Sequence, residues 1–85
     1  MRIDKFLKVS RLLKRRSVAA SACDEARIFV GEKAVKPAYR VKVGDIITIV
    51  YGNRRLTAEV KALNEKVSKD EACTLYEVRE ENTDV

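Results

Sequence analysis

The longest apolar stretch of the chain, from Ile46 to Tyr51, is short, and it is rich in the β-branched residues that favour a buried strand. The dipeptide Gly52-Asn53 follows and favours a turn. Beyond it, apolar and polar residues alternate over residues 56–62, which is typical of a half-buried strand. The chain is therefore predicted to contain a small β-sheet in which these two strands are joined by a turn.

The length of the chain limits it to one hydrophobic core, because 85 residues leave no material for a second one. Pro and Gly are scarce and Ile, Leu and Val recur throughout, so the composition does not indicate disorder. No apolar run approaches the roughly 20 residues of a membrane helix, and the first residues lack the apolar region of a signal peptide. We expect a cytoplasmic protein with no membrane contact, one domain over residues 1–78 and a flexible acidic tail over residues 79–85.

Several classes of chemistry are disfavoured by the residues that are missing. The chain has no His, which excludes a serine–histidine triad and a histidine-containing zinc site. Its two cysteines, Cys23 and Cys73, form no CxxC motif, and we expect both to be small buried thiols rather than metal ligands or a disulfide. No glycine-rich phosphate loop of the GxxxxGK[ST] or GxGxxG type occurs. We therefore expect a binding protein rather than an enzyme, with no cofactor and no metal.

The distribution of charge is the most informative feature for function. Residues 1–44 carry twelve basic and four acidic side chains, whereas residues 45–85 carry six basic and nine acidic ones. Such polarity is expected of a protein that binds a polyanion. A solvated charged face is the ordinary alternative explanation.

The first helix helps to choose between these explanations. A helix over residues 3–13, at about 100° per residue, gathers apolar side chains in a core-facing sector. Lys5, Lys8 and Arg11 gather on the opposite side with no acidic residue among them. Like charges at this spacing repel each other, which favours an anionic partner such as nucleic acid. A membrane surface fits less well, because a protein this small needs the apolar face for its core.

A second helix is predicted from Val18 to about Ala26, with Ser17 as its N-cap. The basic triplet Lys14-Arg15-Arg16 precedes it, where the helix dipole favours phosphate and Arg can bind phosphate through two hydrogen bonds. Gly31-Glu32 then predicts a type II′ hairpin turn between Ile28-Phe29-Val30 and residues 33–36. Near the end of the chain, Ser68 and Glu71 form a capping-box pattern that predicts a short helix reaching Leu75 or Tyr76.

The order of these features resembles the S4-like RNA-binding domain family, whose core is the αL motif. The resemblance rests on the pattern Arg2-x-Asp4-Lys5-x-Leu7, on Arg16 before a helix of small residues, and on Val43-Gly44-Asp45-x-Ile47. A narrower similarity, to the small heat-shock and ribosome-quality-control branch, adds Lys36-Pro37-Ala38 and Glu71-Ala72-x-x-Leu75-Tyr76-Glu77. The resemblance implies an α+β fold, with two N-terminal helices packed on a small, mostly antiparallel sheet and a short C-terminal helix.

The resemblance also implies a site. It points to Arg2, Lys5, Arg11 and Arg16 as RNA contacts, and to Asp4 as the residue that orients Arg16 or caps the first helix. The complete expected RNA-binding set is Arg2, Lys5, Lys8, Arg11, Lys14, Arg15, Arg16, Ser17, Lys33 and Lys36. Two positions depart from the family pattern: Ala26 stands where Gly is usual, and Gly31-Glu32 stands where Asn-Gly is usual.

Members of this branch bind the large ribosomal subunit when peptidyl-tRNA obstructs it, and the short members support tailing of the stalled chain. The resemblance thus implies large-subunit ribosomal RNA and peptidyl-tRNA as partners, together with a factor that tails the nascent chain, and we expect a monomer in solution. Two alternatives stay open: another RNA partner, since one fold serves many RNAs, and an acidic protein bound by the basic face.

Overall fold

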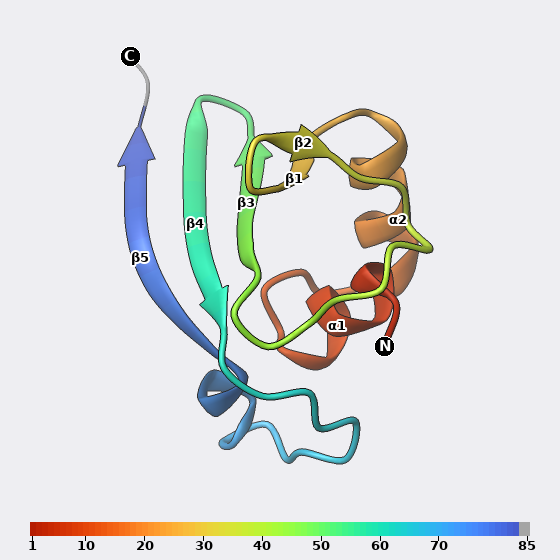
Figure 1. Ribbon diagram of the computed structural model, residues 1–85, viewed down its shortest axis with the longest axis vertical. Coiled ribbons are helices and arrows are strands. Elements are labelled where there is room, and N and C mark those ends of the chain that lie inside the picture. The colour runs from red at the N-terminus through yellow and green to blue at the C-terminus, as the bar shows by residue number, and fades with distance from the viewer. Residues whose placement is uncertain (84–85) are drawn as a thin grey trace.

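The computed structural model describes residues 1–83 and contains two helices at the start of the chain, followed by a sheet (Figure 1). The helices are α1 (Ile3–Val9) and α2 (Arg16–Asp24). The remaining elements are β1 (Ile28–Val30), β2 (Lys33–Ala34), β3 (Ile46–Tyr51), β4 (Arg54–Val60), the 3₁₀ helix η1 (Ala72–Leu75) and β5 (Tyr76–Thr83). This arrangement confirms the expected α+β class. No helix within these residues is long and apolar enough to cross a membrane.

The sheet has five strands in the order β2-β1-β3-β4-β5, and every neighbouring pair is antiparallel. The hairpin predicted at Gly31-Glu32 joins β1 to β2, and Gly31 has the positive φ of 64° that the first position of a type II′ turn requires. The predicted strands on either side of Gly52-Asn53 form β3 and β4, with Ile49 opposite Leu56. The strands expected at 28–30 and 46–51 are thus confirmed, whereas β2 ends at Ala34 instead of residue 36 and β4 covers Arg54–Val60 instead of residues 56–62.

The core lies between the helices and one face of the sheet. Ile3, Phe6 and Leu7 of α1 are fully buried, and Ala19 and Cys23 of α2 pack into the same cluster. The sheet and the segments beside it contribute the rest of this cluster: Ile28, Val41, Ile47, Ile49, Leu56, Val60 and Leu75.

Both helices differ from their predicted bounds. Helix α1 ends at Val9 instead of continuing to residue 13, because Ser10 caps it and Arg11 turns into the left-handed region with φ 64°. Helix α2 begins at Arg16, so Ser17 lies in its first turn and is not the N-cap, and the helix ends at Asp24. The left-handed residue that follows its C-cap is Ala26, with φ 58°.

The C-terminal part also differs from expectation. The capping box predicted from Ser68 and Glu71 does not form. Ser68 Oγ donates to the Glu71 carboxylate at 3.0 Å, but Glu71 itself precedes the four-residue 3₁₀ helix η1, and no side chain caps that helix. Residues 79–83, expected in a flexible tail, continue β5 and pair with β4, where Arg54 faces Thr83. The last two residues of that expected tail lie outside the described residues. Cys73 is exposed rather than buried, whereas Cys23 is buried as expected.

Candidate RNA-binding surface

The amino-terminal end of α1 is held by the segment around residue 39. The Ile3 amide donates to the Tyr39 carbonyl at 2.7 Å, and the Asp4 amide lies 3.4 Å from the Pro37 carbonyl. The next amide, that of Lys5, donates to Oδ1 of Asp4 at 2.8 Å. Because all three first-turn amides have partners inside the protein, the start of α1 can contact an anion only through side chains.

Asp4 organises the cations around it. Its side chain is almost fully buried, and Oδ2 lies 3.2 Å from Nη2 of Arg2 and 3.4 Å from Nε of Arg16. The two arginine side chains remain about half exposed. Asp4 therefore joins the start of α1 to the start of α2, which is the contact that the expected orienting role requires.

The first turn of α2 has the features of an anion site. Among the described residues, the amides of Arg16, Ser17 and Val18 have no hydrogen-bond partner, since the first intrahelical bond runs from the Ala19 amide to the Arg15 carbonyl. No acidic residue lies in this turn, and no side chain caps it. Free amides at the positive end of a helix, beside three cations, form an arrangement that an anion stabilises.

Four of the expected contacts are exposed and not internally neutralised. Within residues 1–83 no ion pair involves Lys8, Arg11, Lys14 or Arg15. Lys5 differs from them, because its Nζ lies 3.1 Å from Oε2 of Glu65 in an exposed ion pair. Such surface pairs contribute about 0–1 kcal/mol, so RNA phosphate can replace this partner at little cost.

The remaining expected contacts are separated by the fold. Lys36 immediately precedes Pro37, whose carbonyl faces the start of α1, so it adjoins the helix surface. Lys33 lies in β2, at the outer edge of the sheet. The structure thus places Lys36 next to the start of α1, while Lys33 lies apart from it at the edge of the sheet.

Arg40 lies beside the expected contacts, although it was not among the residues predicted from the sequence. An isolated antiparallel bridge places Arg40 opposite Arg2, and both residues are exposed. Like charges directly opposite each other are unfavourable unless an anion lies between or beside them. Only the tertiary pairing reveals this neighbour, because no local pattern connects positions 2 and 40.

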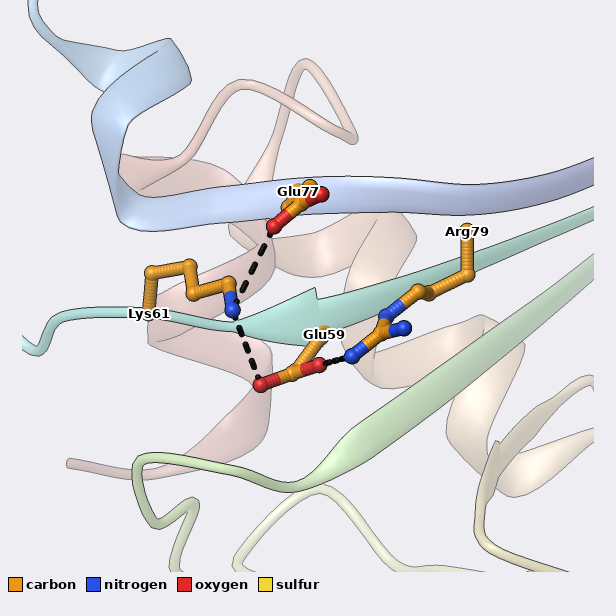
Figure 2. Close-up of polar contacts among 4 residues, drawn as sticks. All are labelled: Glu59, Lys61, Glu77 and Arg79. Atoms are coloured by element: carbon orange, nitrogen blue, oxygen red, sulfur yellow. Dashed lines mark hydrogen bonds and ion pairs between the residues drawn. The ribbon is translucent and has the colours of Figure 1, made fainter.

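The face formed by β4 and β5 has a different electrostatic character (Figure 2). Glu59 contacts both Lys61, at 3.0 Å, and Arg79, and Lys61 also lies 3.3 Å from Glu77. These cations are neutralised by neighbouring carboxylates, whereas most of those around α1 and α2 are not. The described residues contain no cluster of three or more Cys, Asp or Glu side chains suited to a metal ion.

Comparisons with known proteins agree with this geometry. The S4 domain family model matches residues 1–47, and the chain belongs to the S4 domain family. Within that family the chain is similar to proteins named RQC P-site tRNA stabilizing factor, as the expected branch requires. The relative from Halalkalibacterium halodurans is 48% identical over 95% of this chain and 92% of its own length. The relative from Listeria innocua is 44% identical, with 99% and 92% covered.

A solved structure shares the fold. The structure titled as trimeric Heat Shock Protein 15 of Vibrio cholerae superposes with a TM-score of 0.85 at 26% identity. The match covers 93% of this chain and 81% of that one. The expected family and its heat-shock and quality-control branch are therefore confirmed.

Proposed function

We propose that this protein is a non-enzymatic RNA-binding factor that binds the large ribosomal subunit carrying peptidyl-tRNA and assists the rescue of stalled translation. Relatives that match nearly the whole chain are named P-site tRNA stabilizing factors, which supports tRNA and ribosomal RNA as the partners. In this proposal the protein holds the tRNA while another factor tails the nascent chain, and it acts as a cytoplasmic monomer.

The observation that carries the proposal is the start of α2. Its first turn combines three amides without internal partners, no acidic residue, and the adjacent basic triplet Lys14-Arg15-Arg16. Positive side chains at the positive end of a helix dipole destabilise it unless an anion binds there. An RNA phosphate supplies that anion and accepts hydrogen bonds from both the amides and a guanidinium group.

We assign the contacts to two groups. Arg2, Arg16 and the rest of the basic triplet bind phosphates next to the Asp4 carboxylate. Lys5 and Lys8 extend the surface along α1, and Arg11 continues it in the turn after that helix. Ser17, Lys33 and Lys36 contact RNA at the margins of this surface. Asp4 acts through Arg2 and Arg16 and does not touch the RNA.

The test is co-sedimentation of the tagged protein with purified large subunits carrying tRNA in a sucrose gradient. Arg16→Ala is expected to weaken the association by about 1.5–3 kcal/mol, because one charge-assisted phosphate contact is lost. Arg55→Ala is the matched control, since it removes the same charge from an exposed position of β4. Circular dichroism should first show that both variants have the thermal transition of the parent.

Two results would contradict the proposal. The first is a parent protein that does not sediment with large subunits at physiological salt, and the second is an Arg16→Ala variant that binds like the Arg55→Ala control. A salt titration separates RNA from an acidic protein partner. RNA contacts give a slope of log affinity against log salt of about −0.7 per phosphate for single strands. A shallow slope would favour the protein partner.

A further inference from the structure

A groove opens between α2 and the end of β3, outside the phosphate contacts assigned above. Its volume is about 340 Å³, at the lower end of the roughly 300–1,000 Å³ typical of small-ligand pockets. Leu13, Val18 and Ala22 form one wall, and Val50 and Tyr51 form the other. Val18 is 48% exposed, so an apolar side chain faces solvent here without a partner.

Small residues keep the groove open. Ser17, Ser21 and Ala22 lie on the side of α2 that borders it, so no long side chain of the helix fills the space. Its base is fixed by the backbone, because the Val50 amide donates to the Arg27 carbonyl at 2.8 Å and the Arg27 amide donates to the Ala22 carbonyl at 2.9 Å. The groove is therefore preformed.

The edge of the groove is polar and charged. Glu25 and Arg27 line it and pair with each other at 3.2 Å, which places a carboxylate acceptor beside a guanidinium donor. On the strand side, the guanidinium carbon of Arg54 lies 5.8 Å from the centre of the Tyr51 ring. An occupant with a flat apolar body and hydrogen-bonding edges fits these surroundings better than an aliphatic side chain does.

The groove also adjoins the anion site. Leu13 and Ser17 both line it, and these two residues directly flank the basic triplet Lys14-Arg15-Arg16 in the chain. An apolar groove and a cationic helix start thus share the same short segment. A nucleotide combines a flat base with a phosphate, and this segment offers a complementary surface to each part.

We propose that this groove binds one unpaired nucleobase of the RNA, while the adjacent phosphate lies at the start of α2. The proposal rests on the proposed function. The helix surface assigned above contacts only phosphates, and the groove adds the recognition of a base. The base stacks against Tyr51 and Val18, and its polar edge faces the serine hydroxyls and the Glu25–Arg27 pair. Its source is either ribosomal RNA or tRNA, since both present unpaired bases of the same chemistry.

The test fills the groove. Ser21 is exposed and lines it, so Ser21→Trp places a large ring where the base would lie. Ser68→Trp is the matched control, because it makes the same exchange at an exposed position between β4 and η1. Ser21→Trp is expected to weaken binding to large subunits carrying tRNA by about 5- to 150-fold, the effect of losing one base-stacking contact.

Chemical probing of the same complexes gives the decisive result. Dimethyl sulfate and a carbodiimide report the Watson–Crick edges of the bases, and hydroxyl radicals report the backbone, in ribosomal RNA and tRNA separately. The parent and Ser68→Trp should protect an unpaired base that Ser21→Trp leaves reactive, while all three protect the same backbone. The identity of that base shows which RNA supplies it.

Other outcomes would overturn the base site. One is that RNA bases react identically in complexes with the parent and with Ser21→Trp. Another is that a folded Ser21→Trp variant loses the backbone and base protections together. If Ser21→Trp does not fold, Val18→Ser at the exposed apolar wall replaces it, with a few-fold loss of affinity and a more reactive base expected. A parent that protects no backbone would contradict the proposed function itself, which keeps the two failures distinct.

Discussion

Oδ2 of Asp4 lies 3.4 Å from Nε of Arg16, so a buried carboxylate in α1 fixes the position of a cation in the first turn of α2. The same oxygen contacts Arg2 at 3.2 Å. The surface assigned to RNA thus depends on an acidic residue, although its partner is an anion. Net charge alone predicts that removing the Asp4 carboxylate strengthens RNA binding, whereas these contacts predict that it weakens RNA binding.

Asp4→Asn is expected to weaken RNA binding about three- to tenfold, even though it raises the net charge, because Arg2 and Arg16 lose the acceptor that positions them. Isothermal titration calorimetry with large subunits at fixed salt measures the effect. Asp24→Asn makes the same charge change at an exposed position of α2 and should bind as well as the parent or better. If both variants bound large subunits more tightly than the parent and to the same extent, only net charge would matter.

Arg11→Gly should change stability and binding in opposite directions. Arg11 has a φ of 64°, a conformation that costs a residue with a side chain roughly 1–2 kcal/mol and costs glycine little. Glycine should therefore raise the free energy of unfolding by about 0.5–1 kcal/mol, while loss of the guanidinium weakens RNA binding. Urea unfolding and subunit binding, measured on the same preparation, test the two effects. Unchanged binding would remove Arg11 from the surface.

Ala26→Gly should stabilise the fold without affecting binding. Ala26 is left-handed with φ 58°, and the bonds from the Ala26 amide to Cys23 and from the Arg27 amide to Ala22 form a Schellman motif, which favours Gly at this position. A gain of about 1 kcal/mol is expected, or roughly 4–8 °C in Tm. Ala20→Gly lies inside α2 and should instead lower both Tm and the free energy of unfolding, the latter by about 0.5–1 kcal/mol. If both variants shifted Tm in the same direction, the left-handed conformation of Ala26 would not explain the effect of glycine.

The buried thiol predicts a loss of stability in alkali. Burial, with smaller contributions from Asp4 and Asp24, raises the pKa of Cys23 from 9.0 to about 11. Because the folded state holds this proton more tightly than the unfolded state, the contribution is complete below about pH 9 and is lost as the pH rises toward 11. Between pH 9 and pH 11 the free energy of unfolding should fall less for Cys23→Ala than for the parent. The difference between the two declines should reach up to about 2 kcal/mol. A parallel decline would contradict the assignment.

Removal of residues 79–85 should destabilise the protein. Arg79 pairs with Glu59, and β5 continues beside β4 to Thr83, so the deletion exposes most of one side of β4. We expect a loss of about 1–3 kcal/mol, visible as a lower urea midpoint. Arg79→Ala isolates the ion-pair part, which should be the smaller share because Arg79 is half exposed. If the truncated protein were as stable as the parent, residues 79–85 would behave as the flexible tail expected from the sequence.

Local patterns in the sequence predicted the two central strands well, whereas the helical period placed Arg11 on the same helix face as Lys5 and Lys8 although α1 ends at Val9. Ile46–Tyr51 and the alternation after Gly52 have the period of strands, and both became strands. The contact between Asp4 and Arg16 that the expected orienting role needs is also found, although the resemblance to the S4 family supplied that expectation. The assignment of individual residues to RNA contact remains a prediction.

The differences arise where tertiary contacts override local pattern. Leu12 and Leu13 extend the helical period past Val9, and no Gly or Pro marks the end, so the left-handed turn at Arg11 could not be predicted. The charged residues after Val78 carry no strand pattern of their own and form a strand because β4 provides a partner. The groove has walls from α2, β3 and the segment between the helices, and such a juxtaposition has no local sequence signature.

The hydrogen bonds that anchor α1 have a consequence for synthesis of the protein. The Ile3 amide reaches the Tyr39 carbonyl, and the Val41 amide reaches the Met1 carbonyl. The basic helix can therefore dock only after the chain as far as residue 41 has emerged from the ribosome that makes it. Before that point α1 lacks the two backbone contacts that hold its amino-terminal end in the finished fold.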